Sequence, residues 1–307
     1  MEIEGHRGGN SLSLLGIPTA DAHAGFPGPG QGPDVDWGMA TRALTKLVSA
    51  AITLGLVLLG GGTASAAPPR NAEPVGIDVS WPQCGKTLPK QPAFAIVGVN
   101  NGLANTTNPC LADQLAWAST APSPALTAQP RVALYVNTAN PGLQGSWWPS
   151  SNHYGGVDVA NPYGVCGSGP GDFRACSYMY GYAKAYDDAT IRGVDNPEKY
   201  LWWLDVETEN SWQPDKAANV ADLEGMTAYF TSINAKVGLY STGYQWGQIA
   251  GTVPASSPLA GLPSWLAGAR SLTGAKSNCT SPALTPGSRV ALTQYVSGGL
   301  DYNYSCP

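Results

Sequence analysis

Seven short apolar runs recur along the chain, and this repetition constrains the fold more than any other feature. The runs are VGIDVS (75–80), AFAIVGV (93–99), RVALYVN (131–137), YLWWLDV (200–206), KVGLY (236–240), SWLAG (264–268) and RVALTQYV (289–296). Their apolar residues are continuous rather than alternating, which indicates strands that are buried on both faces. Helical patterns over 176–190 and 215–234 lie between strands, and Asp215 is a candidate N-cap for the second.

Strands that alternate with helices predict a parallel sheet in an α/β domain. For a domain of about 240 residues, the favoured closure is a single TIM-like (β/α) barrel. We expect irregular or missing helices in its second half, and disulfides that staple it. A doubly wound open sheet is the alternative.

The first quarter of the chain is expected to lie outside this barrel. Residues 39–66 start at a methionine, carry two basic residues, continue as an apolar segment and end in small residues, which is the pattern of a secretory signal peptide. The alternative, a permanent membrane helix, needs about 20 apolar residues, and this segment is shorter. Residues 1–38, rich in Gly and Pro, are expected to be untranslated or disordered. The barrel domain then covers 67–307, and mature protein begins near Ala67.

The cysteines all lie within that domain. There are six, at Cys84, Cys110, Cys166, Cys176, Cys279 and Cys306. An even number in an exported chain predicts disulfides. About fifteen pairings are possible, and proximity in the sequence favours joining the first to the second, the third to the fourth and the fifth to the sixth.

Bonded cysteines leave little scope for metal or nucleophile chemistry. His153 is the only histidine in the domain, so a site with two histidine ligands is excluded. A Ser-His-Asp triad would depend entirely on this loop residue, which is more simply explained as a solvated surface histidine. We therefore expect no metal and no cofactor.

Charge and aromatic content point to the class of partner. The formal net charge is −5 and no basic run is present, so nucleic acid is not an expected partner. The chain has 10 Trp and 14 Tyr against 4 Phe. Rings with a flat apolar face and a polar edge suit sugars, although such rings also fill hydrophobic cores whose edges contact water.

Carboxylates follow the predicted strands at their carboxyl ends, where barrel active sites lie. Asp78 lies late in the first run, Asp205 and Glu207 end the fourth, and Asp301 follows the last. Residues i and i+2 of a strand point to the same side, about 6.5 to 7 Å apart along the backbone. Two carboxyls so close, beside tryptophans, are expected to raise one pKa and leave an acid next to a base, as glycoside cleavage requires. The alternatives are a calcium site or acids that solvate the barrel mouth; Glu209 is interpreted as a solvated loop acid.

Three segments together resemble one known family. GIDVSWPQ, WLDVETE and TQY followed by LDYN are similar to glycoside hydrolase family 25, exported lysozymes that act as N-acetylmuramidases on peptidoglycan. The resemblance covers residues 74–304. Positions that match the family pattern are Asp78, Ser80 and Gln83 on the first strand, Asp205 and Glu207 on the fourth, Asp301 on the last, and Tyr135, Tyr240, Trp265, Gln294 and Tyr295 around the cleft.

The chain also departs from that family. Gly98 and Asn101 stand where a basic residue and an acid are usual, and Val136 stands where a histidine is frequent. The spacing from Gln294 to Asp301 is shorter than is common, and residues 144–175 form an insertion. Its GSGPGD segment neither follows a strand nor starts a helix in the way a nucleotide-binding loop requires.

The resemblance implies an exported hydrolase of β-1,4 linkages in peptidoglycan. We also expect a monomer that is not membrane-bound after signal cleavage. Glu207 is expected to be the general acid, Asp205 to orient the N-acetyl group or to stabilise positive charge, and Asp78 and Asp301 to line the cleft floor. Two alternatives are a cell-wall glycan-binding protein without turnover and a hydrolase of another exported polysaccharide.

Overall fold

A computed structural model describes residues 73–122, 127–167, 169, 171 and 173–307. The predictions for residues 1–38 and for the signal peptide at 39–66 lie outside the described residues.

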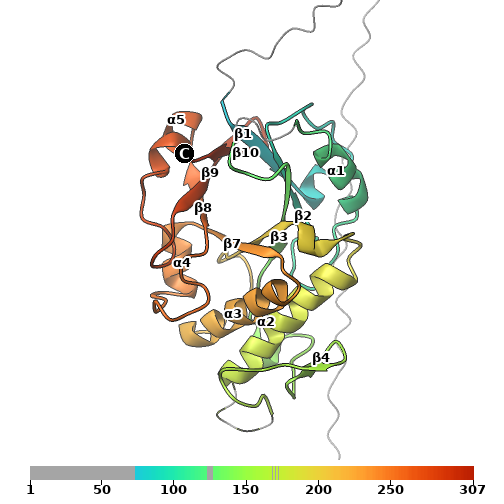
Figure 1. Cartoon of the computed structure of the whole chain (residues 1–307), viewed down its shortest axis with the longest axis vertical. Coiled ribbons are helices and arrows are strands. Elements are labelled where there is room, and N and C mark those ends of the chain that lie inside the picture. Colours follow the sequence, from blue (N-terminus) through green and yellow to red (C-terminus); the bar gives the residue numbers. More distant parts are fainter. Residues whose placement is uncertain (1–72, 123–126, 168, 170, 172) are drawn as a thin grey trace, which may run out of the picture. The chain divides into compact units, whose positions relative to one another are not determined.

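Within the described residues, eight strands form a closed barrel in the order β1-β10-β9-β8-β7-β6-β3-β2 (Figure 1). These strands are β1 (Val75–Val79), β2 (Ala95–Gly98), β3 (Val132–Asn137), β6 (Leu201–Asp205), β7 (Lys236–Ser241), β8 (Ser264–Ala269), β9 (Val290–Ser297) and β10 (Leu300–Ser305). Every neighbouring pair is parallel except the two that involve β10. The predicted α/β barrel is therefore confirmed, and the open sheet is excluded.

The last strand of the barrel, β10, is absent from the strands predicted from apolar runs, and only the family resemblance placed Asp301 on a last strand. It returns antiparallel to β9 through a tight turn at Gly298 and Gly299, whose φ angles are 59° and 76°. Glycine adopts positive φ without steric cost, which suits a two-residue hairpin turn. By pairing with both β9 and β1, this strand closes the barrel and carries Asp301 into it.

Five α-helices accompany the strands in the described residues. They are α1 (Leu111–Ala118), α2 (Phe173–Thr190), α3 (Lys216–Ser232), α4 (Gly243–Ile249) and α5 (Leu272–Asn278), and short 3-10 turns occur at Trp81–Gln83, Gly142–Gln144 and Pro197–Lys199. The two predicted helices correspond to α2 and α3, and the Asp215 side chain caps α3 by accepting from the backbone N–H of Ala217 at 2.9 Å. The helices of the second half, α4 and α5, are short. None of the helices described has both the length and the apolarity that crossing a bilayer demands.

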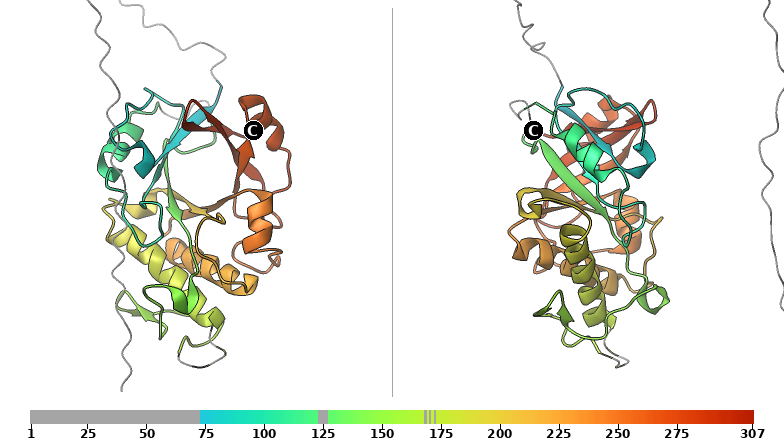
Figure 2. Two further views of the ribbon diagram at one scale, coloured as in Figure 1. Left: turned by 180° about the vertical axis from the view of Figure 1, so that it is seen from behind. Right: turned by 90° about the vertical axis from the view of Figure 1, so that its right-hand side faces the viewer.

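Helices α2 and α3 pack against each other on one flank of the barrel (Figures 1 and 2). A glycine from each helix lies at the contact. A Cβ atom at Gly181 would lie 1.9 Å from the carbonyl oxygen of Asp222, and one at Gly225 would lie 1.9 Å from that of Tyr178. The two backbones approach each other this closely only because both positions lack a side chain.

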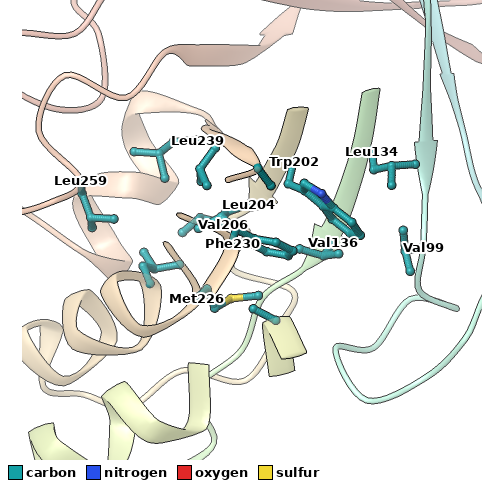
Figure 3. Packing of buried hydrophobic residues seen from close by; sticks show 14 of the residues in the cluster. Val99, Leu134, Val136, Trp202, Leu204, Val206, Met226, Phe230, Leu239 and Leu259 are labelled. Carbon is teal, nitrogen blue, oxygen red and sulfur yellow. The ribbon is translucent and has the colours of Figure 1, made fainter. Parts of the chain in front are cut away.

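Two apolar cores explain why the strands read as continuous apolar runs. Side chains that face the barrel interior form one core, which includes Trp203 and Trp265. The other core lies between the strands and the helices; Figure 3 shows Trp202, Leu204, Met226 and Phe230 in it. Trp202 stacks on Phe230 of α3, with ring centroids 4.5 Å apart. Successive residues of β6 thus alternate between two buried faces, as expected for a covered strand.

Three disulfides staple the domain, and they join cysteines that are neighbours in the sequence. Cys84 bonds to Cys110, Cys166 to Cys176, and Cys279 to Cys306. The second disulfide ties the insertion at 144–175 to the first turns of α2. That insertion also contains a small hairpin of β4 (His153–Tyr154) and β5 (Val157–Asp158), which Figure 1 shows at the α2 end of the molecule.

Candidate active site

A pocket of about 160 Å³ lies at the carboxyl ends of the parallel strands. The residues that line it are Asp78, Tyr135, Asp205, Glu207, Tyr240, Trp265, Gln294 and Asp301. All four carboxylates and four of the five cleft residues named from the sequence are therefore brought together. Their elements explain the convergence, because these side chains come from seven different strands and from the residue two positions beyond the end of β6.

The carboxyl of Asp78 is the most fully satisfied acid of the pocket. Its Oδ1 accepts hydrogen bonds from Asn303 Nδ2 at 2.6 Å and from Gln294 Nε2 at 3.1 Å. Burial, together with repulsion from Asp301, raises the pKa of Asp78 to about 8. Tyr240 in turn donates its hydroxyl to Gln294 Oε1 at 2.8 Å, which fixes the orientation of that amide.

Asp205 is held at the end of β6, where an amide fixes one of its oxygens. Its Oδ2 accepts from Asn137 Nδ2 at 3.0 Å. Its buried Oδ1 has no amide, hydroxyl or backbone donor among the described residues, and the carboxyls of Asp205 and Glu207 share a hydrogen bond. Burial first, then repulsion from Glu207 and Asp78, raises the pKa of Asp205 well above its ordinary value.

Glu207 lies just beyond β6 and is only half-buried. Burial raises the pKa of its carboxyl, and the negative charges of Glu209 and Asp301 raise it further. The indole N–H of Trp212 donates to the backbone oxygen of Glu207 at 2.8 Å, which fixes the turn that follows the strand. Asp205 and Glu207 are therefore neighbouring acids in unequal environments, the first deep in the barrel and the second open to the pocket.

Glu209 is exposed, as expected for a loop acid, but it has a defined partner. Its Oε2 accepts from Gln245 Nε2 of α4 at 3.0 Å. Gln245 is itself positioned by Thr242, the N-cap of α4, whose side-chain oxygen accepts from the Gln245 backbone N–H at 3.0 Å. A negative charge is thus held near Glu207 and Asp205, where it raises the pKa of both carboxyls.

Aromatic rings form one wall of the pocket. Trp265 contacts Tyr240 at a centroid distance of 4.4 Å and Tyr135 at 6.4 Å. The unusual Gly98 has a steric explanation here: a Cβ atom at this position would lie 2.5 Å from the Tyr135 ring and 2.6 Å from Ser80 Cβ. The tyrosine ring thus lies where a larger residue on β2 would place its side chain.

Two residues named from the sequence lie elsewhere. Tyr295 does not line the pocket; it stacks on Tyr302 with ring centroids 5.5 Å apart. Adjacent residues of a strand point to opposite faces, so Gln294 and Tyr295 cannot both face the interior of the barrel. His153 is exposed on β4, where its Nδ1 lies 2.8 Å from Asp158 Oδ1, and it does not line the pocket either.

Sequence reasoning missed the amides that support the acids. Asn137 and Asn303 each bond to a pocket carboxylate. Each lies two residues beyond a residue already named for the site, Tyr135 on β3 or Asp301 on β10, and therefore points to the same side of its strand. Strand parity was thus the signal that could have found them. In the part of the chain that the structure describes, no group of three or more acids, histidines or cysteines is placed to hold a metal ion.

Comparisons with known proteins agree with the resemblance read from the sequence. A family model described as "Lysozyme-like protein 1" matches residues 188–271, a segment that contains Asp205, Glu207, Tyr240 and Trp265. A protein of Dictyostelium discoideum described as "Probable GH family 25 lysozyme 4" is 34% identical over 97 residues. The chain resembles family 25 lysozymes. This alignment covers 32% of the chain and 42% of the relative, so the chain spans about two-fifths of that protein's length.

Solved structures of lysozymes are also similar to this chain. A bacterial lysozyme from Streptomyces coelicolor has a TM-score of 0.44 and 18% identity, over 76% of this chain and 93% of that one. A family GH25 lysozyme from Aspergillus fumigatus has a TM-score of 0.45 and 13% identity, over 76% and 94% of the two chains.

Proposed function

We propose that the protein is a secreted glycoside hydrolase that cleaves β-1,4 linkages of peptidoglycan, as a lysozyme-like N-acetylmuramidase. The observation that carries this proposal is the convergence of Asp78, Asp205, Glu207 and Asp301 with three aromatic side chains in one pocket. A pocket of about 160 Å³ is small beside ligand sites of roughly 300 to 1,000 Å³. Only the reacting part of a polymer would enter it, and the rest of the glycan would lie across the barrel mouth.

Glu207 is proposed as the general acid. It is the carboxyl of the central pair that is open to the pocket, and burial and its acidic neighbours raise its pKa. A carboxylic acid kept neutral in this way can protonate the leaving oxygen of the glycosidic bond.

Asp205 is proposed to act on the sugar rather than on the leaving group. Asn137 fixes one of its oxygens, and the other has no amide or hydroxyl donor among the described residues. That second oxygen could accept the N–H of a 2-acetamido group. The positive charge that develops at the sugar carbon would favour the ionised form of Asp205, which burial and the neighbouring acids disfavour.

The proposed mechanism is substrate-assisted, with the 2-acetamido oxygen attacking the anomeric carbon while Glu207 donates its proton. Water then opens the cyclic intermediate, and the products initially retain the β configuration. Walls that lack the N-acetyl group on the muramic sugar should therefore resist cleavage while they are still bound. Rapid hydrolysis of such walls, or an initial α product in proton NMR spectra, would exclude substrate assistance.

Export is part of the proposal. Residues 39–66 are proposed as a cleaved signal peptide, so that the mature, monomeric domain begins near Ala67. The intact mass of secreted protein tests this boundary. Material that keeps residues 39–66 would argue for a membrane anchor instead.

The decisive experiment is dye release from labelled peptidoglycan, followed by mass analysis of the soluble products. Muropeptides with a reducing N-acetylmuramic acid end are expected, because that is the product of β-1,4 cleavage by a muramidase. Binding to walls without cleavage at any pH would favour the binding-protein alternative. Cleavage of a different exported polysaccharide, with peptidoglycan left intact, would assign another substrate.

A further inference from the structure

A second and larger pocket opens at the opposite end of the barrel. It has a volume of about 710 Å³, within the roughly 300 to 1,000 Å³ of small-molecule sites. Its residues include Leu201 and Lys236, which begin β6 and β7, and Pro263 and Arg289, which immediately precede β8 and β9. The pocket therefore lies at the amino ends of the parallel strands, whereas the candidate active site lies at their carboxyl ends.

Trp203 lies in the wall of this amino-end pocket. Its side chain is fully buried, and its indole N–H has no hydrogen-bond acceptor among the described residues. Leaving a buried donor unpaired costs about 1 to 3 kcal/mol, so buried donors without partners are rare in native proteins. A ligand oxygen could supply the missing acceptor.

The rim of the pocket is positively charged, although the chain as a whole carries a formal net charge of −5. Lys199, Lys236 and Arg289 are exposed there, and the ion pairs found in the described part of the chain include none of them. Glu198 is the only acid among the described lining residues. Three cations without acidic partners, gathered around an apolar pocket, give the site a preference for negative charge.

We propose that the amino-end pocket binds a small organic anion with an apolar body. The body would pack against Tyr200, Leu201 and Trp203, and the acid group would lie among Lys199, Lys236 and Arg289. This site is separate from the proposed catalytic pocket, so its existence does not depend on the proposed hydrolase activity. One side chain of each pocket touches the other, because Trp203 of the amino-end pocket contacts Trp265 of the catalytic pocket edge-on at a centroid distance of 5.6 Å.

The test is a fluorescence titration of the folded, disulfide-bonded protein with the sulfonate dye 1-anilinonaphthalene-8-sulfonate. Saturable binding at one site is expected, and decanoate should displace the dye whereas decyltrimethylammonium should not. A double variant, Lys236→Gln with Arg289→Gln, should weaken dye binding by about tenfold or more. Its matched control is Lys86→Gln with Lys90→Gln, which removes the same charge from exposed positions outside this pocket and should change binding by less than about twofold.

A variant of the wall tests the same site independently of charge. Trp203→Phe removes the indole N–H and keeps an aromatic ring, so it should weaken dye binding by several-fold; near-UV circular dichroism would verify that the variant is folded. The proposal is overturned if the protein does not bind the dye. It is also overturned if the neutral analogue N-phenyl-1-naphthylamine binds as tightly as the sulfonate, or if the two double variants behave alike.

Discussion

Asp78 of β1 and Asp301 of β10 are register partners across an antiparallel ladder, and both carboxyls line the same pocket. Asp78 is the more buried of the two, with only 6% of its surface exposed. Burial and the charge of Asp301 together raise the pKa of Asp78 to about 8, even though two amides donate to it. The barrel thus holds a carboxyl group whose ionisation the folded state opposes.

Stability should therefore fall as pH rises between about 4 and about 8. The pKa of Asp78 in the folded state lies above its value of 3.8 in the unfolded chain. The contribution of Asp78 to the free energy of unfolding is therefore fully present below pH 3.8 and is lost as the pH approaches 8. One such group changes the free energy of unfolding by up to about 1.4 kcal/mol per pH unit. Urea unfolding between these pH values should show a smaller decline in Asp78→Asn than in the wild type. Asp113→Asn, a change at an exposed position on α1, should leave the decline of the free energy of unfolding with pH as it is in the wild type. An equal decline in Asp78→Asn and the wild type would contradict the raised pKa of Asp78.

Glu207→Gln should abolish turnover while the fold and glycan binding persist. The amide is nearly isosteric with the acid but has no proton to deliver, and general acid catalysis contributes about 10²- to 10⁴-fold. Dye release from labelled walls and wall pull-down, measured on the same preparation, separate catalysis from binding. Turnover at the wild-type rate would remove Glu207 from the mechanism.

Glu209→Gln should move the basic limb of the pH–activity profile to lower pH. The charge of Glu209 raises the pKa of Glu207, so removing that charge lets the proposed acid lose its proton earlier. The shift should shrink at high ionic strength, because Glu209 is exposed and salt screens its charge. Asp113→Asn is again the matched control. An unchanged profile, or a limb that moves to higher pH, would mean that Glu209 does not tune Glu207.

The sequence predicted most of the barrel because β1, β2, β3 and β6 to β9 are covered on both faces. Burial on two faces leaves continuous apolar runs, and Trp202 and Trp203 illustrate this, since one faces the helices and the other the barrel interior. The antiparallel strand β10 has polar residues such as Asp301 and Asn303 facing inward, so its sequence LDYNYS has no apolar run. An apolar pattern cannot reveal a strand whose inner face is built for a polar site.

The acids of the pocket were predictable because strand ends place them together. The amides were not, since nothing in the sequence distinguishes Asn137 from other asparagines until the register between β3 and β6 places it opposite Asp205. Tyr295 was assigned to the cleft by resemblance alone. Strand parity argued against that placement, and the stacking on Tyr302 agrees with parity.

The glycine contact between α2 and α3 gives a final prediction about stability. Gly181→Ala or Gly225→Ala would place a methyl group 1.9 Å from a backbone oxygen of the facing helix, and a backbone atom cannot move aside as a flexible side chain can. Overpacking of this kind typically costs about 1 to 3 kcal/mol, occasionally more. Urea unfolding should show the loss for each variant.

Gly247→Ala in α4 is the matched control, because a Cβ atom there would meet nothing within 4 Å. The same chemical change should stabilise the protein by roughly 0.5 to 1 kcal/mol, since alanine has the higher helix propensity. Opposite signs at Gly181 and Gly247 would therefore separate steric contact from backbone propensity. If Gly181→Ala and Gly225→Ala were as stabilising as Gly247→Ala, α2 and α3 would have to lie farther apart than this contact requires.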